Sequence, residues 1–329
     1  MSFFKSFSKK LFYINNENFD EQALSLFQYQ ATHNLIYKQY LDYLSINSSK
    51  VQSVEKIPFL PIEFFKNYKI KTGSWQEEKI FESSGTTGEV TSKHFVKELK
   101  HYQEVCSTNF SFFFAAPDQY HIFALLPSYL ERKNASLVYM MQHLIESSQS
   151  ALSGFYLQDL EKLKFQLNKA LNSQRKVILL GVTFALLDFA EAFSFDLSNA
   201  IIMDTGGMKG RRKEMIREEV HGFLKQKWNL NSVASEYGMT ELMSQAYAEA
   251  DGKLKTPPWM KVLVRDLNDP FSLSNRKSGG VNIIDLANIH SCAFIETADI
   301  GTVDNKNGHF EILGRTDTSD VRGCNLMVI

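Results

Sequence analysis

The chain has 329 residues, of which 44% are hydrophobic and 22% are charged, and its formal net charge at pH 7 is -1. This composition is typical of a globular protein, and a charge close to zero argues against a nucleic-acid-binding protein, which normally carries a basic face. The three cysteines, Cys106, Cys292 and Cys324, show no C-x-x-C spacing, so neither a disulfide framework nor a zinc site is predicted.

The N-terminal segment contains lysines and lacks the unbroken apolar core of a signal peptide. The longest apolar run, residues 177–187, is too short to cross a bilayer. We therefore expect a cytoplasmic protein with reduced thiols and no membrane span.

Residues 1–75 are predicted to be mainly helical. Leu24, Phe27, Leu35 and Leu41 are among the apolar residues that recur at helical spacing. Two prolines in the segment 57–66 predict an extended stretch before a further helix.

Residues 76–255 show short apolar strands in alternation with helices. Strands are expected at 78–81, 121–127, 176–181 and 200–207, and helices at 95–114, 135–147, 157–172, from a cap at Thr183, and at 211–228. This alternation predicts an α/β fold with a mainly parallel sheet flanked by helices, as the core that would bind a nucleotide.

From about residue 256 the pattern changes to short strands separated by Gly, Asn and Asp turns: KVLVRDL, GGVNIIDL, CAFIETADIG and GHFEILGR. They predict a small antiparallel or barrel-like β subdomain at 256–315, followed by a hinge-like tail at 316–329. The chain shows no repeat or long linker, so residues 1–315 are expected to form one large domain.

Residues 81–94 read FESSGTTGEVTSKH and predict a loop between the strand at 78–81 and the helix expected from 95. Glycines let backbone N–H groups approach a phosphate, hydroxyls add donors, and a lysine supplies compensating charge. The residues with these properties are Ser83, Ser84, Gly85, Thr86, Thr87, Gly88 and Lys93. The loop alone fits an ordinary Ser/Gly turn equally well, and it lacks the Gly-Lys-Ser/Thr of a Walker A loop.

A second cluster is ASEYGMTE at residues 234–241. The ring of Tyr237 can stack on a base, and Gly238 lets the backbone bend. Thr240 and Glu241 present oxygens to a hard cation. A core tyrosine and a solvated carboxylate are the plain alternatives.

Two more clusters follow in the β-rich part. ETADIG at 296–301 contains Asp299, which can accept hydrogen bonds from a ribose diol, and LGR at 313–315 ends in Arg315. A turn aspartate and a surface arginine are the plain alternatives.

Taken in order, the four clusters resemble the core motifs of the adenylate-forming superfamily, which includes acyl-CoA ligases and acyl-protein synthetases. The matching segments are SSGTTG with Lys93, YGMTE, TAD at 297–299 and GR at 314–315. The resemblance implies that ATP and Mg²⁺ are the cofactors. It places the Ser/Thr/Gly loop on the phosphates, YGMTE on adenine and metal, and TAD on ribose, with the turn TGGM at 205–208 beside adenine.

By this resemblance the catalytic residues are Thr86, Lys93 and Glu241, and Thr86 and Glu241 also hold the metal. The nucleotide-binding residues are Ser83, Ser84, Gly85, Thr87, Gly88, Gly206, Gly207, Met208, Tyr237, Gly238, Thr240, Asp299 and Arg315. His94, beside the loop, could assist phosphate binding, but a solvated histidine is the expectation.

Within the superfamily, IPFLPIEFFKNYKI at 57–70, the short length and the ending resemble the acyl-protein synthetases of bacterial fatty-acid reductase systems. Ser235 stands where many superfamily members have asparagine. The usual C-terminal domain with its catalytic lysine is expected to be absent.

The resemblance implies activation of a carboxylic acid, of the long-chain fatty class, as an acyl-adenylate, with transfer to a cysteine thiol of the protein or of a partner. Cys324 is the expected acceptor, because chain termini are mobile and the nearby Arg322 favours the thiolate. An acyl-CoA-reductase-like or carrier protein is the expected partner. An acyl-CoA ligase and a non-catalytic nucleotide-binding relative remain open as alternatives.

The acyl group requires an apolar pocket. Candidate lining residues, which fit a plain core equally, are Phe110, Phe112, Phe113, Phe114, Tyr139, Met140 and Met141.

Overall fold

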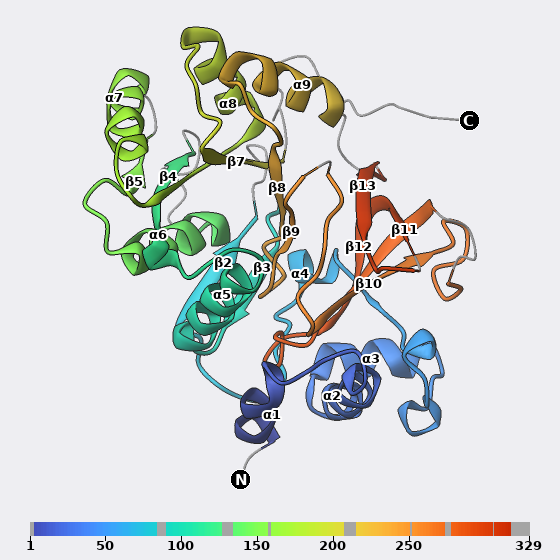
Figure 1. The fold of residues 1–329 in the computed structure, drawn as a ribbon. Coiled ribbons are helices and arrows are strands. Elements are labelled where there is room, and N and C mark those ends of the chain that lie inside the picture. The colour runs from blue at the N-terminus through green and yellow to red at the C-terminus, as the bar shows by residue number, and fades with distance from the viewer. Residues whose placement is uncertain are drawn as a thin grey trace.

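The computed structural model describes residues 3–83, 90–126, 134–156, 159–206, 215–250, 252–273, 278–304 and 306–316. Within these ranges the chain forms two large sheets that lie side by side, with helices around them (Figure 1). The site is built where the ends of strands from the two sheets come together.

The six-stranded sheet has the order β5-β4-β6-β7-β8-β9. Its strands are β4 (Tyr120–Leu125), β5 (Gly154–Phe155), β6 (Lys176–Gly181), β7 (Ala200–Thr205), β8 (Ala234–Tyr237) and β9 (Ala246–Ala248). Neighbouring strands pair in parallel except β9, which is antiparallel to β8. Strand β4 is buried along its whole length, as expected for a parallel strand covered on both faces.

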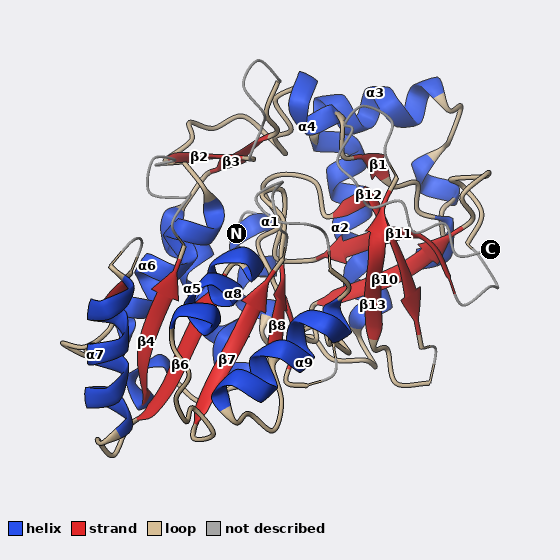
Figure 2. Cartoon of the chain, turned by 90° about the horizontal axis from the view of Figure 1, so that it is seen from above, coloured by secondary structure: helices blue, strands red, loops and turns tan. Residues whose placement is uncertain are grey.

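Helices cover both faces of this sheet (Figure 2), which confirms the predicted α/β fold. They are α5 (Leu99–Phe113), α6 (Ser136–Ser148), α7 (Leu160–Leu171), α8 (Thr183–Ala192) and α9 (Arg217–Trp228). The cap expected at Thr183 is wrong by one residue, because Val182 is the N-cap and Thr183 begins α8. The Thr183 hydroxyl instead donates to Oδ1 of Asp204 at 2.6 Å, since that carboxylate is the stronger acceptor.

The Ser/Thr/Gly loop connects two antiparallel strands, β2 (Lys79–Glu82) and β3 (Lys93–Val96), and not a strand and a helix as predicted. The error arose because the apolar Phe95 and Val96 continue the helical spacing of the residues that follow. Both side chains are nonetheless buried by the hairpin, and α5 begins only at Leu99.

The second sheet has β1-β12-β11-β10 as its order, with β13 paired to β12. Its strands are β1 (Leu60–Pro61), β10 (Met260–Arg265), β11 (Ser278–Asp285), β12 (Phe294–Val303) and β13 (Phe310–Arg315). The four strands predicted after residue 256 are therefore present and antiparallel. They form an open sheet, and β1 from the N-terminal part joins it in parallel.

The helices predicted in the first 75 residues are also present: α1 (Phe3–Leu11), α2 (Phe19–His33), α3 (Leu35–Tyr43) and α4 (Phe64–Asn67), with two short 3₁₀ turns at Ser48–Lys50 and Val54–Lys56. They are tied to the second sheet by buried polar bonds. The amide of Gln30 donates to the Asn288 carbonyl at 3.0 Å and accepts from the Ala293 N–H at 2.9 Å.

Among the residues that the structure describes, none of the helices has the length and apolar character needed to cross a membrane. Two of the cysteines, Cys106 and Cys292, are free and buried, and Cys324 lies outside the described residues.

Candidate active site

Three predicted residues meet between the two sheets. Tyr237 ends β8, and its hydroxyl donates to Oδ2 of Asp299 on β12 at 2.6 Å. Arg315, the last residue of β13, is the register partner of Asp299, and its Nε lies 3.1 Å from Oδ1 of that carboxylate. The structure thus joins the YGMTE, TAD and GR segments, which are far apart in the sequence.

The charges around Asp299 decide what it can bind. Burial raises its pKa, whereas the Arg315 guanidinium and the Tyr237 hydroxyl lower it. Burial and the Asp299 carboxylate together hold the pKa of Tyr237 well above its usual value, so that tyrosine keeps its proton and donates. The side chain of Arg315 is 63% exposed. A ribose hydroxyl would therefore compete with Arg315 for Asp299 more easily than with Tyr237.

The two ends of the Ser/Thr/Gly loop are closed against each other. The N–H of Ser92 donates to Oγ of Ser83 at 2.9 Å, and the N–H of Ser83 donates to the Ser92 carbonyl at 3.1 Å. The Ser92 side chain lies beside the buried carboxylate of Glu241. Burial raises the pKa of Glu241, and the Ser92 side chain and the nearby Arg315 oppose the rise. The base of the predicted phosphate loop therefore lies against the predicted metal ligand.

His94 does not lie in solvent as expected. It belongs to β3, and its side chain is buried against the YGMTE segment. Its Nδ1 lies 2.9 Å from the Thr240 carbonyl, and its Nε2 lies 3.0 Å from Oδ1 of Asn288. The amide of Asn288 also donates to the Glu241 carbonyl at 2.7 Å. Burial lowers the pKa of His94 to about 4, so the ring is neutral near pH 7. Asn288 was not predicted from the sequence, since no motif includes it.

Glu236 is a second residue that the sequence analysis missed, although an acid inside a buried strand is a visible signal. Its Oε2 accepts a hydrogen bond from the Thr205 hydroxyl at the end of β7. A Cβ added at Gly238 would lie only 2.6 Å from Oε1 of Glu236, so a larger residue there would have to displace that carboxylate. Glu236 thus bridges the two strand ends that precede Gly206 and Gly238.

The other predicted residues are placed as follows. Gly206 is exposed directly after β7, and Lys93 is exposed at the start of β3, one residue beyond Ser92. Ser84, Gly85, Thr86, Thr87, Gly88, Gly207, Met208 and Cys324 lie outside the described residues, so their roles stay predictions.

The candidate acyl-pocket residues separate in the structure. Phe113 and Phe114 line a cavity of about 370 Å³ together with Tyr120, Ile201 and Ala234. The cavity lies at the amino ends of β4, β7 and β8, which is the sheet edge opposite Thr205 and Tyr237. Of the remaining candidates, Phe110, Met140 and Met141 are buried in the core, Tyr139 is partly buried against it, and Phe112 is 56% exposed.

In the described part of the chain, no group of three or more His, Cys, Asp or Glu side chains could hold a metal ion. Mg²⁺ bound to a nucleotide needs only one or two protein carboxylates, because phosphates and waters supply its other ligands. Glu241, at the base of the predicted phosphate loop, fits that requirement.

This arrangement of two sheets with helices is also found in solved adenylate-forming ligases. The fold is similar to an open conformation of 2-hydroxyisobutyryl-CoA ligase in complex with 2-HIB-AMP and CoA, at a TM-score of 0.66 and 10% identity over 96% of this chain and 79% of that chain. ATP-bound MatB from Rhodopseudomonas palustris aligns at a TM-score of 0.54 and 16% identity over 72% of this chain. The aligned part spans about half of MatB, 47% of its length. The molecule thus has the fold of the adenylate-forming ligases.

The family is narrower than the fold. Residues 13–329 match the family described as Acyl-protein synthetase, LuxE. Two relatives are each described as a long-chain-fatty-acid–luciferin-component ligase. The Vibrio harveyi protein is 23% identical over 91% of this chain and 84% of its own length, and the Aliivibrio fischeri protein is 22% identical over 93% and 86%. The chain belongs to the LuxE acyl-protein synthetase family and is a ligase of that family.

Proposed function

We propose that this protein uses ATP to activate a long-chain fatty acid as an acyl-adenylate and then passes the acyl group to a cysteine thiol. The observation that carries the proposal is the meeting of Tyr237, Asp299 and Arg315 from two sheets, with Glu241 beside the base of the Ser/Thr/Gly loop. The description of both relatives as fatty-acid ligases supports the choice of acid.

In this proposal the nucleotide lies across the strand ends. The adenine packs between the ring of Tyr237 and the turn that begins at Gly206, and the ribose diol donates to Asp299. The loop from Ser83 to Gly88 surrounds the phosphates, and Lys93 contributes a positive charge. Magnesium, held by Glu241 and by Thr86, would neutralise phosphate charge when bound.

The chemical step needs alignment more than covalent help from the protein. A carboxylate oxygen of the fatty acid attacks the α-phosphorus, a new P–O bond forms, and the bond to pyrophosphate breaks. Both reactants are anions, so the protein must hold them together and offset their charge. Loop N–H groups, hydroxyls and Lys93 are the groups that this chain provides.

The 370 Å³ cavity is the proposed place for the distal end of the acyl chain. Its walls are more apolar than polar, and it lies at the sheet edge opposite the strand ends that carry Thr205 and Tyr237. A strand rises about 3.3 Å per residue, so the six residues of β7 separate the two sheet edges by roughly 17 Å, a span that suits a long rather than a short acid.

The acceptor thiol is proposed to be Cys324. Attack requires a thiolate, and burial raises the pKa of Cys292 to about 12 and that of Cys106 further, so neither is a nucleophile near pH 7. The Cys324 sulfur would attack the acyl carbonyl carbon, a thioester bond would form, and AMP would leave with the former anhydride oxygen.

Labelling tests both steps. Incubation with ATP, Mg²⁺ and a labelled fatty acid is expected to give protein-bound label that neutral hydroxylamine removes. Cys324→Ser should lose this label and keep acid-dependent ATP–pyrophosphate exchange, while the matched control Cys292→Ser should keep both. Undiminished label on Cys324→Ser would show that the acyl group is carried elsewhere. Free acyl-CoA formed only on addition of CoA would indicate an acyl-CoA ligase instead.

A further inference from the structure

The TAD segment lies in a break of the β11–β12 ladder. Asn282 pairs with Glu296 and Gly280 pairs with Ile300, so the three residues 297–299 of β12 stand opposite the single residue Val281. A bulge of this kind interrupts the ladder hydrogen bonds and turns side chains to new directions. Asp299 is the last residue of this bulge and its carboxylate accepts from the Tyr237 hydroxyl, so a group that supports the bulge also holds Asp299.

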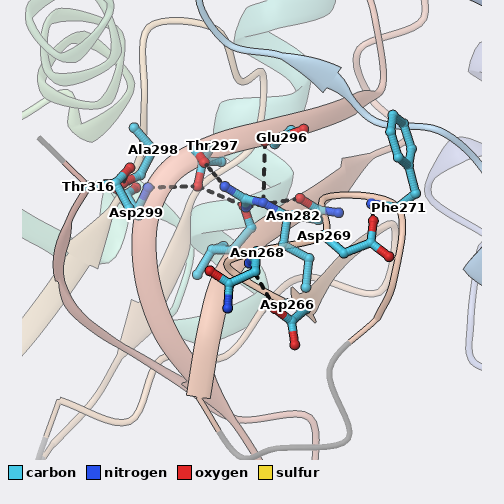
Figure 3. Close-up of polar contacts among 12 residues, drawn as sticks. Asp266, Asn268, Asp269, Phe271, Asn282, Glu296, Thr297, Ala298, Asp299 and Thr316 are labelled. Atoms are coloured by element: carbon cyan, nitrogen blue, oxygen red, sulfur yellow. Dashed lines mark hydrogen bonds and ion pairs between the residues drawn. The ribbon is translucent and has the colours of Figure 1, made fainter. Parts of the chain in front are cut away.

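Arg265, the last residue of β10, supplies that support. Its Nη1 donates to the Val281 carbonyl at 2.9 Å and to Oδ1 of Asn282 at 3.1 Å. Its Nη2 donates to the Thr297 carbonyl at 2.8 Å. Figure 3 shows Asn282 and Thr297 turned toward this group of bonds.

The guanidinium is buried, with only 8% of the side chain exposed, and its Nε lies 3.3 Å from Oε1 of Glu296. A buried charge is costly unless it is paired and hydrogen-bonded, and Arg265 has an ion-pair partner and three hydrogen bonds. The neighbouring strand leaves room for it, because a Cβ at Gly280 would lie 2.4 Å from Cζ of Arg265. Glycine at 280 and arginine at 265 therefore depend on each other.

Thr297 connects the guanidinium to Asp299. Its hydroxyl donates to the Val281 carbonyl at 2.8 Å and accepts from the Asp299 N–H at 3.1 Å. Arg265 holds both the carbonyl of Thr297 and the carbonyl that receives the Thr297 hydroxyl. Arg265 thus bonds the Thr297 carbonyl, and the Thr297 hydroxyl bonds the main-chain N–H of Asp299.

We propose that Arg265 is a positioning residue for nucleotide binding, which acts through Thr297 and the β12 bulge to aim the Asp299 carboxylate at the ribose. The inference rests on the proposed function, in which Asp299 binds the ribose diol. Arg265 itself touches no ligand. Its loss should therefore remove discrimination for the ribose hydroxyls and not binding of the phosphates.

The test compares equilibrium binding of ATP and 2′,3′-dideoxy-ATP, both with Mg²⁺, to the full-length chain. The wild type is expected to prefer ATP by about tenfold or more, the value of charge-assisted bonds to a carboxylate. Asp299→Ala, Arg265→Lys and Thr297→Val should each bring the preference close to one. Lys261→Ala, an exposed change on the same strand that removes an ion pair with Asp20, should leave it unchanged.

Each outcome has a definite meaning. A wild type that binds neither nucleotide contradicts the proposed function, and one that binds both equally overturns the positioning role together with the ribose role of Asp299. A wild type that prefers ATP while Arg265→Lys keeps the same preference overturns the inference alone. If Arg265→Lys fails to fold, Thr297→Val decides, because it keeps the buried charge and removes the hydroxyl that bonds both the Val281 carbonyl and the Asp299 N–H. An unchanged preference for ATP in Thr297→Val would then overturn the inference.

Discussion

Glu236 is a carboxylic acid within β8, one residue before Tyr237, and burial raises its pKa to about 7. The hydrogen bond from Thr205 opposes this rise and the neighbouring Asp204 adds to it. The charge of Glu236 also raises the pKa of three nearby groups, Tyr102 and Cys106 on α5 and Tyr247 on β9. The proton on Glu236 is therefore lost within the range where the protein would work.

The sign of the resulting pH dependence follows from the two pKa values. The folded value of about 7 exceeds the usual 4.5, so the folded state binds this proton more tightly. The protonated Glu236 therefore adds to the free energy of unfolding in full below about pH 4.5. This contribution, on the order of 3 kcal/mol, is lost as the pH rises through 7.

Glu236→Gln keeps the shape and removes the titration. We expect urea unfolding at pH 5 to 9 to show the variant gaining stability relative to the wild type as the pH rises. Glu249→Gln, an exposed acid, is the control and should follow the wild-type pH profile. A difference between Glu236→Gln and wild type that stays constant with pH would contradict the raised pKa.

At the scale of elements, the β2–β3 hairpin is fastened to the segment after β8. His94 on β3 faces the Thr240 carbonyl, and Asn288, which follows β11, bonds both His94 and the Glu241 carbonyl. The loop that is proposed to hold phosphates and the residue proposed to hold magnesium are thereby fixed relative to each other.

Asn288→Ala tests this clamp. The change removes the buried partner of His94 Nε2 and of the Glu241 carbonyl, so we expect a loss of about 1–3 kcal/mol in unfolding free energy. Pyrophosphate exchange should fall about tenfold or more, because small misplacement of reacting groups is costly. Asn307→Ala, in an exposed turn, is the control. Lower stability with an unchanged exchange rate would make the clamp purely structural.

Across the whole molecule, local patterns predicted much of the fold. Alternating apolar strands and amphipathic helices gave the parallel sheet, and turn residues marked the strands after residue 256. The prediction of a helix from residue 95 is wrong. Phe95 and Val96 fit the apolar spacing of the helix that follows, and only their tertiary packing shows that they belong to strand β3. The pairing of β1 with β12 joins residues over 200 positions apart and leaves no local signal.

The site likewise contains residues that the sequence predicts and residues that only the structure reveals. Tyr237, Glu241 and Asp299 stood out because each lies in a short motif of recognisable chemistry. Arg265 and Asn288 act through partners on other strands, so their roles become visible only when those strands are placed. Two adjacent glycines at 279–280 were the one sequence sign that a large side chain lies close to β11.

Acid-dependent ATP–pyrophosphate exchange tests the central claim, that segments from both sheets form one acid-activating site. The wild type should exchange pyrophosphate only with a carboxylic acid present, and more readily with long-chain than with short-chain acids. Glu241→Ala and Thr86→Ala should each lower the rate about 10²-fold or more, the scale of losing one preorganised stabilising group. Glu17→Ala, a change of an exposed acid just before α2, should not lower it. Exchange that both Glu241→Ala and Thr86→Ala retain at the wild-type rate would contradict the account.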